Sequence, residues 1–495
     1  MADKKMKTKV FSIVTGLLLF PALLNGQTSS VAYFMNLPQS RLLNPALKPA
    51  NRFYIGLPGL SGINVTIGNN FLKFTDILVP GASFDSIFTF QHKNFDLKKF
   101  ASKLNSKNSV IADGSVQLLG IDFPVGKNFS VMLDVNDRFT TKVLFPKSLL
   151  DLYFTGGSDL IGKTFDISDL NAKGLLFREY GAGFSGEIIH NLRIGARVKL
   201  LSGISSVSFD DKTFTLKVNN DLTQAVTANS TLDVAGQDEL DRITNAGSAG
   251  STIKNYINVP LKNSGFGFDF GAVYDIGRML SFSVSVKDLG FINWKNDLKA
   301  WKASGSFTLP GITLQDVQNQ TFSIDEMGSR LADSIKANFR QVATPSAFRT
   351  NLPTQVIAGA SFTPIKLISF GVLSVTKMYA GSANQATTLS ANLHLGQVFS
   401  ATAAYTMANS SYNNLGFGMA VKAGVAQIYI LADKIPVSWD KYKFSDNASS
   451  SVPLPQNFNM ISFQFGINIV FGKQVAKKAD VPVLQSQDNT VQQQQ

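Results

Sequence analysis

Apolar and polar residues alternate along most of the chain, in segments of roughly 8–14 residues separated by short and long connections in turn. The last segment shows the pattern most clearly. One face carries Ile461, Phe463, Phe465, Ile467, Ile469 and Phe471, and the other carries Met460, Ser462, Gln464, Gly466, Asn468 and Val470. Because a β-strand has a period of two, one face of such a segment suits lipid and the other suits a polar lumen.

The pattern predicts an all-β fold, namely a transmembrane antiparallel β-barrel of about 14 strands over residues 52–472. An even number of strands places both ends of the barrel on one side of a membrane. The predicted strands span approximately 52–67, 114–123, 128–138, 178–189, 192–208, 265–274, 279–290, 354–362, 367–376, 387–395, 397–407, 414–422, 425–434 and 458–471.

A soluble β-sandwich also alternates, and the connections decide between the two folds. Tight turns such as 124–127 and 275–278 follow even-numbered strands. Long connections, which follow odd-numbered strands, cover 68–113, 139–177, 209–264, 291–353 and 435–457. Bacterial barrels show this asymmetry, with short periplasmic turns and long extracellular loops. Trp294 and Trp439 then fall near the outer ends of their strands, where an aromatic girdle is expected.

Composition agrees with a membrane barrel. Hydrophobic residues make up 44% of the 495 residues and include 39 Phe, yet outside the N-terminus there is no apolar run long enough for a helical span. Residues 1–26 read as a signal peptide: a lysine-rich start, an apolar run over 10–24, and Gly26 before the expected cut. The absence of cysteine excludes a lipoprotein anchor and disulfides. The basic residues are scattered, so no nucleic-acid site is expected.

Three segments outside the strands have patterns of their own. Residues 236–256 contain a polar Gly/Ser stretch that we expect to be mobile. Residues 325–340 have apolar positions at helical spacing and predict a short amphipathic helix. The Gln-rich residues 473–495 read as a disordered periplasmic tail.

Candidate catalytic chemistry is sparse. The three histidines are His92 in the first long loop, His190 in a predicted turn, and His394 on the expected lumen face. His394 and Ser390 share that face but stand about 13 Å apart on one strand, too far for a nucleophile and its base. No metal-ligand spacing is present, so we expect no enzyme activity, no metal and no cofactor.

A set of charged residues projects inward on the predicted register. Glu187 and Arg193 flank one turn and are placed to pair across it. The set lines a polar conduit or holds a plug, or else it forms a salt-bridged interior that closes a narrow lumen. Its members are Asp134, Arg138, Glu187, Arg193, Arg197, Lys199, Asp269, Lys287 and Lys422.

The segment before the first strand has unusual apolar content. Leu42, Leu43 and Leu47 surround a turn-forming Asn44-Pro45 pair. Pro45 restricts Asn44 to extended conformations, so the turn is preset. The segment is either a periplasmic linker or an N-terminal hatch, and we assign residues 27–51 to a hatch.

The Asn44-Pro45-Ala46 element before the first strand, together with the strand number, resembles the FadL-type outer-membrane transporters of long-chain fatty acids and other hydrophobic compounds. The Gln27 start, the Phe-rich strands and the absence of cysteine resemble a Bacteroidetes branch of that superfamily. The resemblance implies a 14-stranded barrel whose N-terminus plugs the lumen, with Asn44, Pro45 and Ala46 in the hatch.

Two functions follow from this resemblance. The leading one is gated, passive uptake of hydrophobic, fatty-acid-like small molecules across the bacterial outer membrane. The alternative is an outer-membrane docking or assembly barrel for surface or secretion-system proteins. The expected partners are therefore outer-membrane lipid and either a hydrophobic ligand or a surface protein, and we expect a monomer.

Overall fold

The computed structural model describes residues 30–71, 97–149, 151, 160–221, 223–245, 248–309, 340–408, 411–442, 452–455 and 460–473. The predicted signal peptide, His92, the tail beyond 473 and all but the last residue of the predicted helix 325–340 lie outside these residues.

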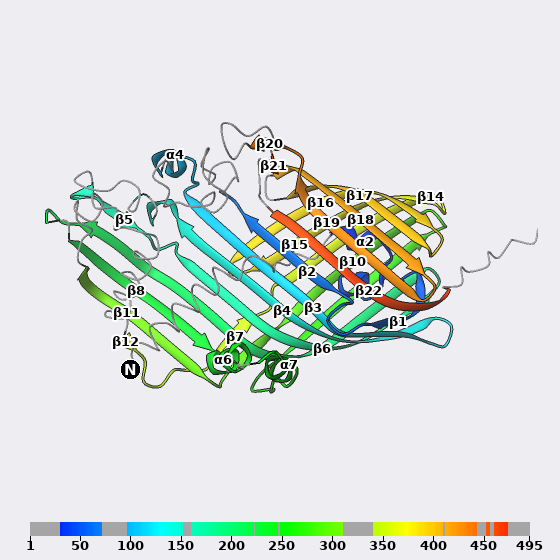
Figure 1. Ribbon diagram of the computed structural model, residues 1–495, viewed down its shortest axis with the longest axis horizontal. Coiled ribbons are helices and arrows are strands. Elements are labelled where there is room, and N and C mark those ends of the chain that lie inside the picture. Colours follow the sequence, from blue (N-terminus) through cyan, green and yellow to red (C-terminus); the bar gives the residue numbers. More distant parts are fainter. Residues whose placement is uncertain are drawn as a thin grey trace, which may run out of the picture.

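The described residues form a closed 14-strand antiparallel barrel, as the alternation predicts (Figure 1). All predicted strands are present, several of them longer than expected. They are β1 (Asn51–Gly56) with β2 (Ile63–Asn69), β3 (Lys107–Val125), β4 (Phe129–Pro146), β6 (Asn171–Ile189), β7 (Leu192–Val218), β9 (Asn263–Ile276), β10 (Leu280–Trp294), β13 (Phe348–Asn351) with β14 (Thr354–Ile365), β15 (Ile368–Tyr379), β16 (Ser382–Leu395), β17 (Phe399–Ala408), β18 (Ser411–Ala423), β19 (Ala426–Pro436) and β22 (Met460–Lys473).

The first predicted strand, 52–67, is present but is interrupted in its middle. β1 and β2 both pair with β3 on one side and β22 on the other, so together they form a single wall strand. The break between them contains Pro58 and Gly59, which has a φ of 70°. Proline has no backbone N–H and a positive φ does not fit a strand, so the ladder stops here and resumes at Ile63.

The two faces of the wall differ as the alternation predicts. Phe266, Phe268 and Phe270 on β9 point outward and are 41–53% exposed. Asp269, between two of them, is 1% exposed and points into the barrel. The outward apolar side chains form the belt that a membrane barrel presents to lipid; we call it the apolar belt.

A β-bulge in β10 reverses the alternation of that strand. The register with β9 shifts between Val286 and Leu289, and Asp288 has a φ of 62°. Lys287 and Asp288 therefore both point inward, and from Leu289 onward odd residues face outward. An αL backbone is uncommon for residues other than glycine, but aspartate is among those that adopt it most readily.

The two ends of the barrel differ. One end has the predicted tight turns, with Gly126, Gly277, Gly396 and Gly424 in positive-φ positions. At the other end β7 continues past the barrel and pairs with β5 (Thr164–Asp166) and β8 (Gln224–Ala235). β11 (Leu298–Leu309) then pairs with β8, and β12 (Arg340–Gln341) with β11. We call these strands the outer sheet; it extends far beyond the barrel mouth (Figure 1).

Several helices complete the described structure. They are α2 (Ser30–Phe34), the 3-10 helix η2 (Pro38–Leu42), α4 (Leu97–Ser102), α6 (Gln237–Thr244) and α7 (Ala249–Ile257). β20 (Trp439–Tyr442) and β21 (Val452–Pro455) form a separate pair. In the segment 236–256, where the sequence predicts a mobile Gly/Ser stretch, α6 and α7 occupy most of the described residues. Within the described residues no helix is long and apolar enough to span a membrane.

Candidate functional site

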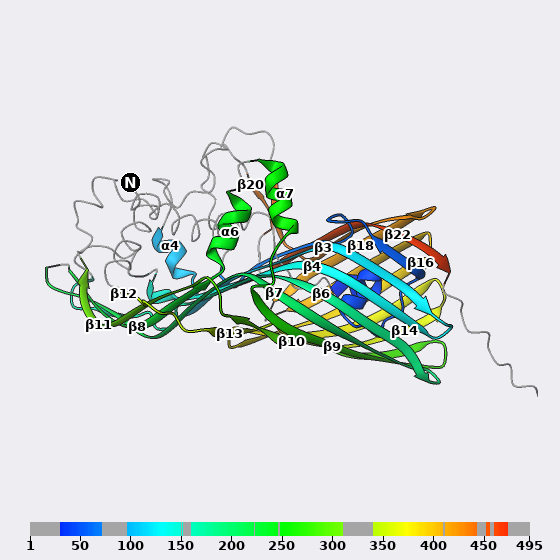
Figure 2. The ribbon, with the colours of Figure 1, turned by 90° about the horizontal axis from the view of Figure 1, so that it is seen from below.

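The N-terminal segment lies inside the barrel, where Figure 2 shows α2 enclosed by the wall strands. We call residues 30–50 the hatch. Val31, Met35 and Leu37 are at most 1% exposed and pack against inward residues of the wall such as Leu373 and Leu431. The hatch contributes no strand to the barrel, so it fills the lumen without being part of the wall.

Polar contacts join the hatch to the wall. The Gln39 amide donates to the Ser61 carbonyl and the Asn468 side chain, both at 2.9 Å. Arg41 forms a buried ion pair with Asp122 of β3 and donates to Ser185 of β6 at 2.9 Å. At the start of the hatch, the Ser30 backbone N–H donates to the Asp433 carboxylate of β19 at 2.7 Å.

The predicted hatch motif fits against β7, β9 and β10. Asn44 and Ala46 are fully buried, and the Asn44 side chain accepts a hydrogen bond from the Ala46 N–H at 2.9 Å. The Leu43 carbonyl accepts from Ser285 of β10 at 2.9 Å. A Cβ at Gly195 would come within 2.6 Å of the Pro45 and Ala46 backbone, so this close approach requires glycine.

The same relation recurs around the barrel. Six inward-facing glycines of the wall stand where a Cβ would come within 3.1 Å of a hatch atom. They are Gly195, Gly271, Gly359, Gly371, Gly416 and Gly418. Small barrels are usually filled by side chains of the wall itself. Here the wall leaves a bore at this level, and the hatch fills it.

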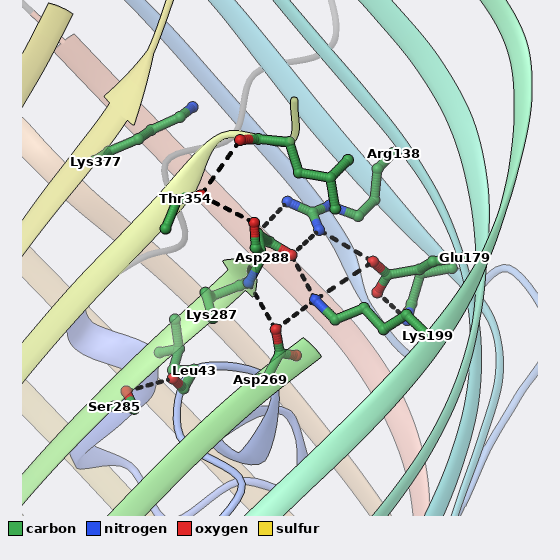
Figure 3. Close-up of polar contacts among 12 residues, drawn as sticks. Leu43, Arg138, Glu179, Lys199, Asp269, Ser285, Lys287, Asp288, Thr354 and Lys377 are labelled. Carbon is green, nitrogen blue, oxygen red and sulfur yellow. Dashed lines mark hydrogen bonds and ion pairs between the residues drawn. The ribbon is translucent and has the colours of Figure 1, made fainter. Parts of the chain in front are cut away.

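Next to the hatch, a cluster of eight charged side chains fills the lumen, and Figure 3 shows its part around Asp288, Lys199 and Glu179. We call it the charge layer. It has four cations, Arg138, Arg197, Lys199 and Lys287, and four anions, Asp134, Glu179, Asp269 and Asp288. The formal charges cancel, and each of these side chains has an ion-pair partner within the layer.

Two residues lie at the centre of the charge layer. Asp288 accepts from both terminal nitrogens of Arg138, at 2.7 and 2.8 Å, and from Lys199 at 2.5 Å. Arg197 contacts three carboxylates: Asp134, Glu179 at 2.9 Å and Asp269 at 2.9 Å. In such a network every buried charge has an oppositely charged partner and hydrogen bonds, which offset the cost of removing the charge from water.

Strand periodicity stacks the charge layer directly on the hatch. Along β7 the inward positions are Gly195, against the hatch, then Arg197 and Lys199 in the charge layer. On β10 the Ser285 side chain bonds the hatch, and Lys287 follows in the charge layer. Inward residues two apart on a strand are about 6–7 Å apart along it. The lumen is therefore closed by two adjacent layers of different origin.

A polar cavity lies between these layers. It has a volume of about 70 Å³, room for a few waters. Gln39 and Leu42 of the hatch line it together with charged groups of the wall, including Arg138, Glu179 and Lys377. Lys377 forms a buried ion pair with Asp113. A cavity of this size and polarity does not hold a fatty-acid-like molecule.

An apolar cluster closes the barrel further from the hatch. It contains Phe177, Leu201, Ile292, Trp294 and Leu352. Trp294 is fully buried and donates its indole N–H to Thr350 at 3.1 Å, so its predicted place in an outward aromatic girdle is wrong. The bulge at Asp288 is the reason, because it turns the even positions of β10 inward. Trp439, at the start of β20, is 49% exposed.

The remaining predicted residues lie away from the charge layer. Glu187 and Arg193 are register partners beside the β6–β7 turn, and Glu187 accepts from the Asn191 N–H at 3.2 Å. Lys422 donates to the Asn51 side chain at 2.9 Å. His190 lies in that same turn, and His394 has Ser400 as a neighbour at 3.4 Å.

Two members of the charge layer were missing from the predicted set. Glu179 shares the odd, inward positions of β6 with Glu187, so strict alternation could have found it. Asp288 could not be found in this way, because it is inward only as a consequence of the bulge.

Comparison with known proteins identifies a family. Residues 45–433 match the model of a family of unknown function, DUF5723, and the chain belongs to that family. No curated protein matches the chain. The strand number and the N-terminal segment inside the lumen, both implied by the FadL resemblance, are present in the structure.

Solved structures of two other proteins are similar to the chain over most of its length, at low identity. A Pseudomonas aeruginosa FadL homologue is 10% identical, covers 91% of this chain and 100% of its own, and has a TM-score of 0.39. The Pseudomonas putida toluene transporter TodX is 10% identical, covers 90% and 95%, and has a TM-score of 0.37. Likenesses at this level do not indicate what the present chain carries.

Proposed function

We propose that the protein is a bacterial outer-membrane barrel that admits hydrophobic, fatty-acid-like small molecules when its hatch leaves the lumen. The observation that carries the proposal is the hatch itself: a separate segment, buried in a bore that glycines of the wall leave open. A barrel whose interior served only stability could fill the same space with its own side chains.

Membrane location is supported by the outward face of the wall. Phe268, Phe282 and Val284 are 41–50% exposed, although large apolar side chains normally avoid water. Exposed apolar residues recur on strands all around the barrel, including Phe370, Phe417 and Phe465. A continuous apolar band with a polar, charged interior is the arrangement of a transmembrane barrel and is opposite to that of a soluble one.

The charge layer sets a condition on any transport. Among the described residues the hatch and the charge layer occupy the lumen, and we take this conformation as the closed state. Hatch release would open the bore up to the charge layer, and passage would further require movement of Arg138 or Lys287, which border the cavity. Uptake is therefore expected to be gated and slow rather than porin-like.

Removal of the hatch tests the proposal. The variant lacking residues 28–46 loses no strand, so it should still form a barrel, as judged by circular dichroism. In planar bilayers its single-channel conductance should rise above that of the full chain, and cells carrying it should take up a hydrophobic fluorescent probe without gating. A second variant, in which a Gly/Ser linker of equal length replaces residues 30–46, separates the loss of the hatch side chains from the shortening of the chain and should behave in the same way. Unchanged conductance and uptake in both variants would overturn the proposal.

A second function, docking of surface or secretion-system proteins, is favoured by the outer sheet. β7 runs for 27 residues and carries β8 and β11 well beyond the barrel mouth. An ion pair joins this outer part of β7 to β6, since Lys173 pairs with Asp210 at 2.9 Å. Although partial burial of Asp210 opposes ionisation, this contact keeps the pKa of its carboxyl below the ordinary value.

Because the chain has no cysteine, single introduced cysteines can distinguish the two functions. Lys217→Cys, exposed on the outer sheet, should react with a membrane-impermeant thiol reagent on intact cells, whereas Lys127→Cys, in a tight turn, should react only after permeabilisation. The reverse result would overturn the orientation. If the hatch deletion leaves uptake unchanged while cross-linking from position 217 captures a defined surface protein, docking is the function.

A further inference from the structure

The last residues of α7 and the segment that links α7 to β9 are fixed to the outside of the barrel wall. Arg178 of β6 donates to the carbonyls of Tyr256 and Ile257, both at 2.8 Å, and is held by a buried ion pair with Asp137 of β4. Ser202 of β7 donates to the Pro260 carbonyl at 3.0 Å. Figures 1 and 2 place α6 and α7 at the junction of the barrel and the outer sheet. The position of this segment is therefore set by the wall.

This anchored segment exposes apolar side chains beside the apolar belt. Ile257 is 62% exposed and Leu261 is 53% exposed. Leu261 precedes the start of β9 by two residues, and the first outward belt residue of that strand, Phe266, is 53% exposed. Exposed apolar side chains thus stand on both sides of the start of β9, at the end of the strand that pairs with β7 near the outer sheet.

Three exposed cations lie at this same edge. Lys262 and Lys295 are on neighbouring segments, because Asn296 donates to the Lys262 carbonyl at 2.6 Å and the Lys295 N–H donates to Asn263 at 3.0 Å. Arg349 lies beside Asn293 on the paired strand β13 and donates to its side chain at 3.0 Å. Its guanidinium lies 4.0 Å from the ring centroid of Phe291, an outward residue above the belt.

These cations are not neutralised by the described part of the protein. Neither Lys262, Lys295 nor Arg349 makes an ion pair with any described acid. Asp297, two residues beyond Lys295, accepts the Asp238 N–H at 2.6 Å and lies 3.8 Å from Lys299, so its charge is engaged elsewhere. We call Lys262, Lys295 and Arg349 the basic rim.

We propose that the basic rim binds the phosphate groups of outer-leaflet lipid, with the lipid tails against Leu261 and Phe266. This inference rests on the membrane location in the proposed function. A phosphorylated glycolipid has the required chemistry, since it presents anionic groups directly above its acyl chains. Lys262 and Lys295 would attract the phosphate as point charges. Arg349, already oriented by Phe291, could donate two parallel hydrogen bonds to it.

The test compares two triple variants of the full chain. Lys262→Gln/Lys295→Gln/Arg349→Gln removes the basic rim. Lys127→Gln/Arg278→Gln/Lys366→Gln removes two lysines and one arginine from exposed tight turns at the opposite end of the barrel. Each protein is reconstituted in phosphatidylcholine vesicles containing a minor fraction of lipid A, and the retention of lipid A on the purified barrel is measured against increasing salt.

The rim variant should retain about tenfold less lipid A than the unmodified chain, and the opposite-end variant should match the unmodified chain. Retention should fall as salt rises, because the contacts are exposed. Equal retention by both variants would overturn the proposal. So would displacement of lipid A by inorganic phosphate alone, since that would mean a simple anion site. If instead no protein inserts into vesicles, the membrane location has failed rather than the rim.

Discussion

The hatch and the charge layer close adjacent levels of the same lumen, but they differ in what they are made of. The hatch is a separate segment that packs against wall glycines and bonds to the wall through a few polar groups. The charge layer is built by side chains of the wall strands β4, β6, β7, β9 and β10. Under the proposed function the first closure leaves without unfolding the barrel, whereas we expect the second to contribute to the barrel's own stability.

The largest effect is expected in the charge layer. Arg197→Met keeps the volume of the side chain but leaves Asp134, Glu179 and Asp269 without their shared cation. Breaking a buried ion pair from one side costs about 3–5 kcal/mol, because the remaining charges are buried and uncompensated. The free energy of unfolding, measured by urea titration of the barrel in lipid vesicles, should fall by that amount.

A surface lysine provides the control for this loss. Lys107 pairs with Asp169 at 2.9 Å and its side chain is 70% exposed, so Lys107→Met should cost only about 0–1 kcal/mol. If the two methionine variants were equally stable, the charge layer would not be part of the barrel's stability, and the contrast with the hatch would fail.

A smaller effect is expected two residues away on β7. Gly195→Ala adds one methyl group that would lie against the backbone of Pro45 and Ala46. Overpacking of this kind costs about 1–3 kcal/mol, and undocking of the hatch would relieve it. We therefore expect single-channel records with frequent openings, while the urea midpoint of the barrel changes little.

Gly267→Ala is the matched control for the hatch clash. It is also an inward glycine, on the neighbouring strand β9, but an added Cβ would have 3.3 Å to its closest neighbour, Leu352. This variant should stay as closed as the unmodified chain. Openings of equal frequency in both variants would show that the methyl group acts on the wall and not on the hatch.

These two layers also show which parts of the structure could be predicted from the sequence. Period-two alternation predicts the strands and the side of the wall that each residue faces. A shift of one residue would turn every apolar side chain from the lipid to the lumen, so the register is fixed. It fails where the backbone departs from a regular strand. The Pro58-Gly59 break interrupts the first strand, and the αL residue Asp288 turns Trp294 from the outside to the inside.

There is a second reason why the alternation of residues cannot predict which side chains meet in the charge layer. Arg138 and Asp288 are 150 residues apart, and only the closure of the barrel brings their strands to face each other. The outer sheet was missed likewise: β8 and β11 pair across about 70 residues, and β8 carries small polar residues such as Thr227 and Ser230 that weaken its periodicity. Non-local pairing of this kind has no local signature.

The smallest effect is expected at the predicted hatch motif itself. Asn44→Ala removes the side-chain acceptor of the Ala46 N–H, together with two longer contacts to the carbonyls of Ala272 and Val284, at 3.4 and 3.3 Å. Loss of one short hydrogen bond in a buried site costs about 0.5–1.5 kcal/mol. That cost falls on hatch docking rather than on the wall, so the open probability should rise by roughly two- to tenfold while the circular dichroism spectrum is unchanged.

Asn105→Ala is the control. It removes a comparable side-chain bond, to the Asn70 carbonyl at 2.7 Å, outside the lumen, and should leave conductance as it is. A rise in both variants would attribute the openings to a general loosening of the barrel. A rise in neither would mean that Pro45 and the surrounding leucines hold the turn without Asn44, and that the hatch is fixed by packing alone.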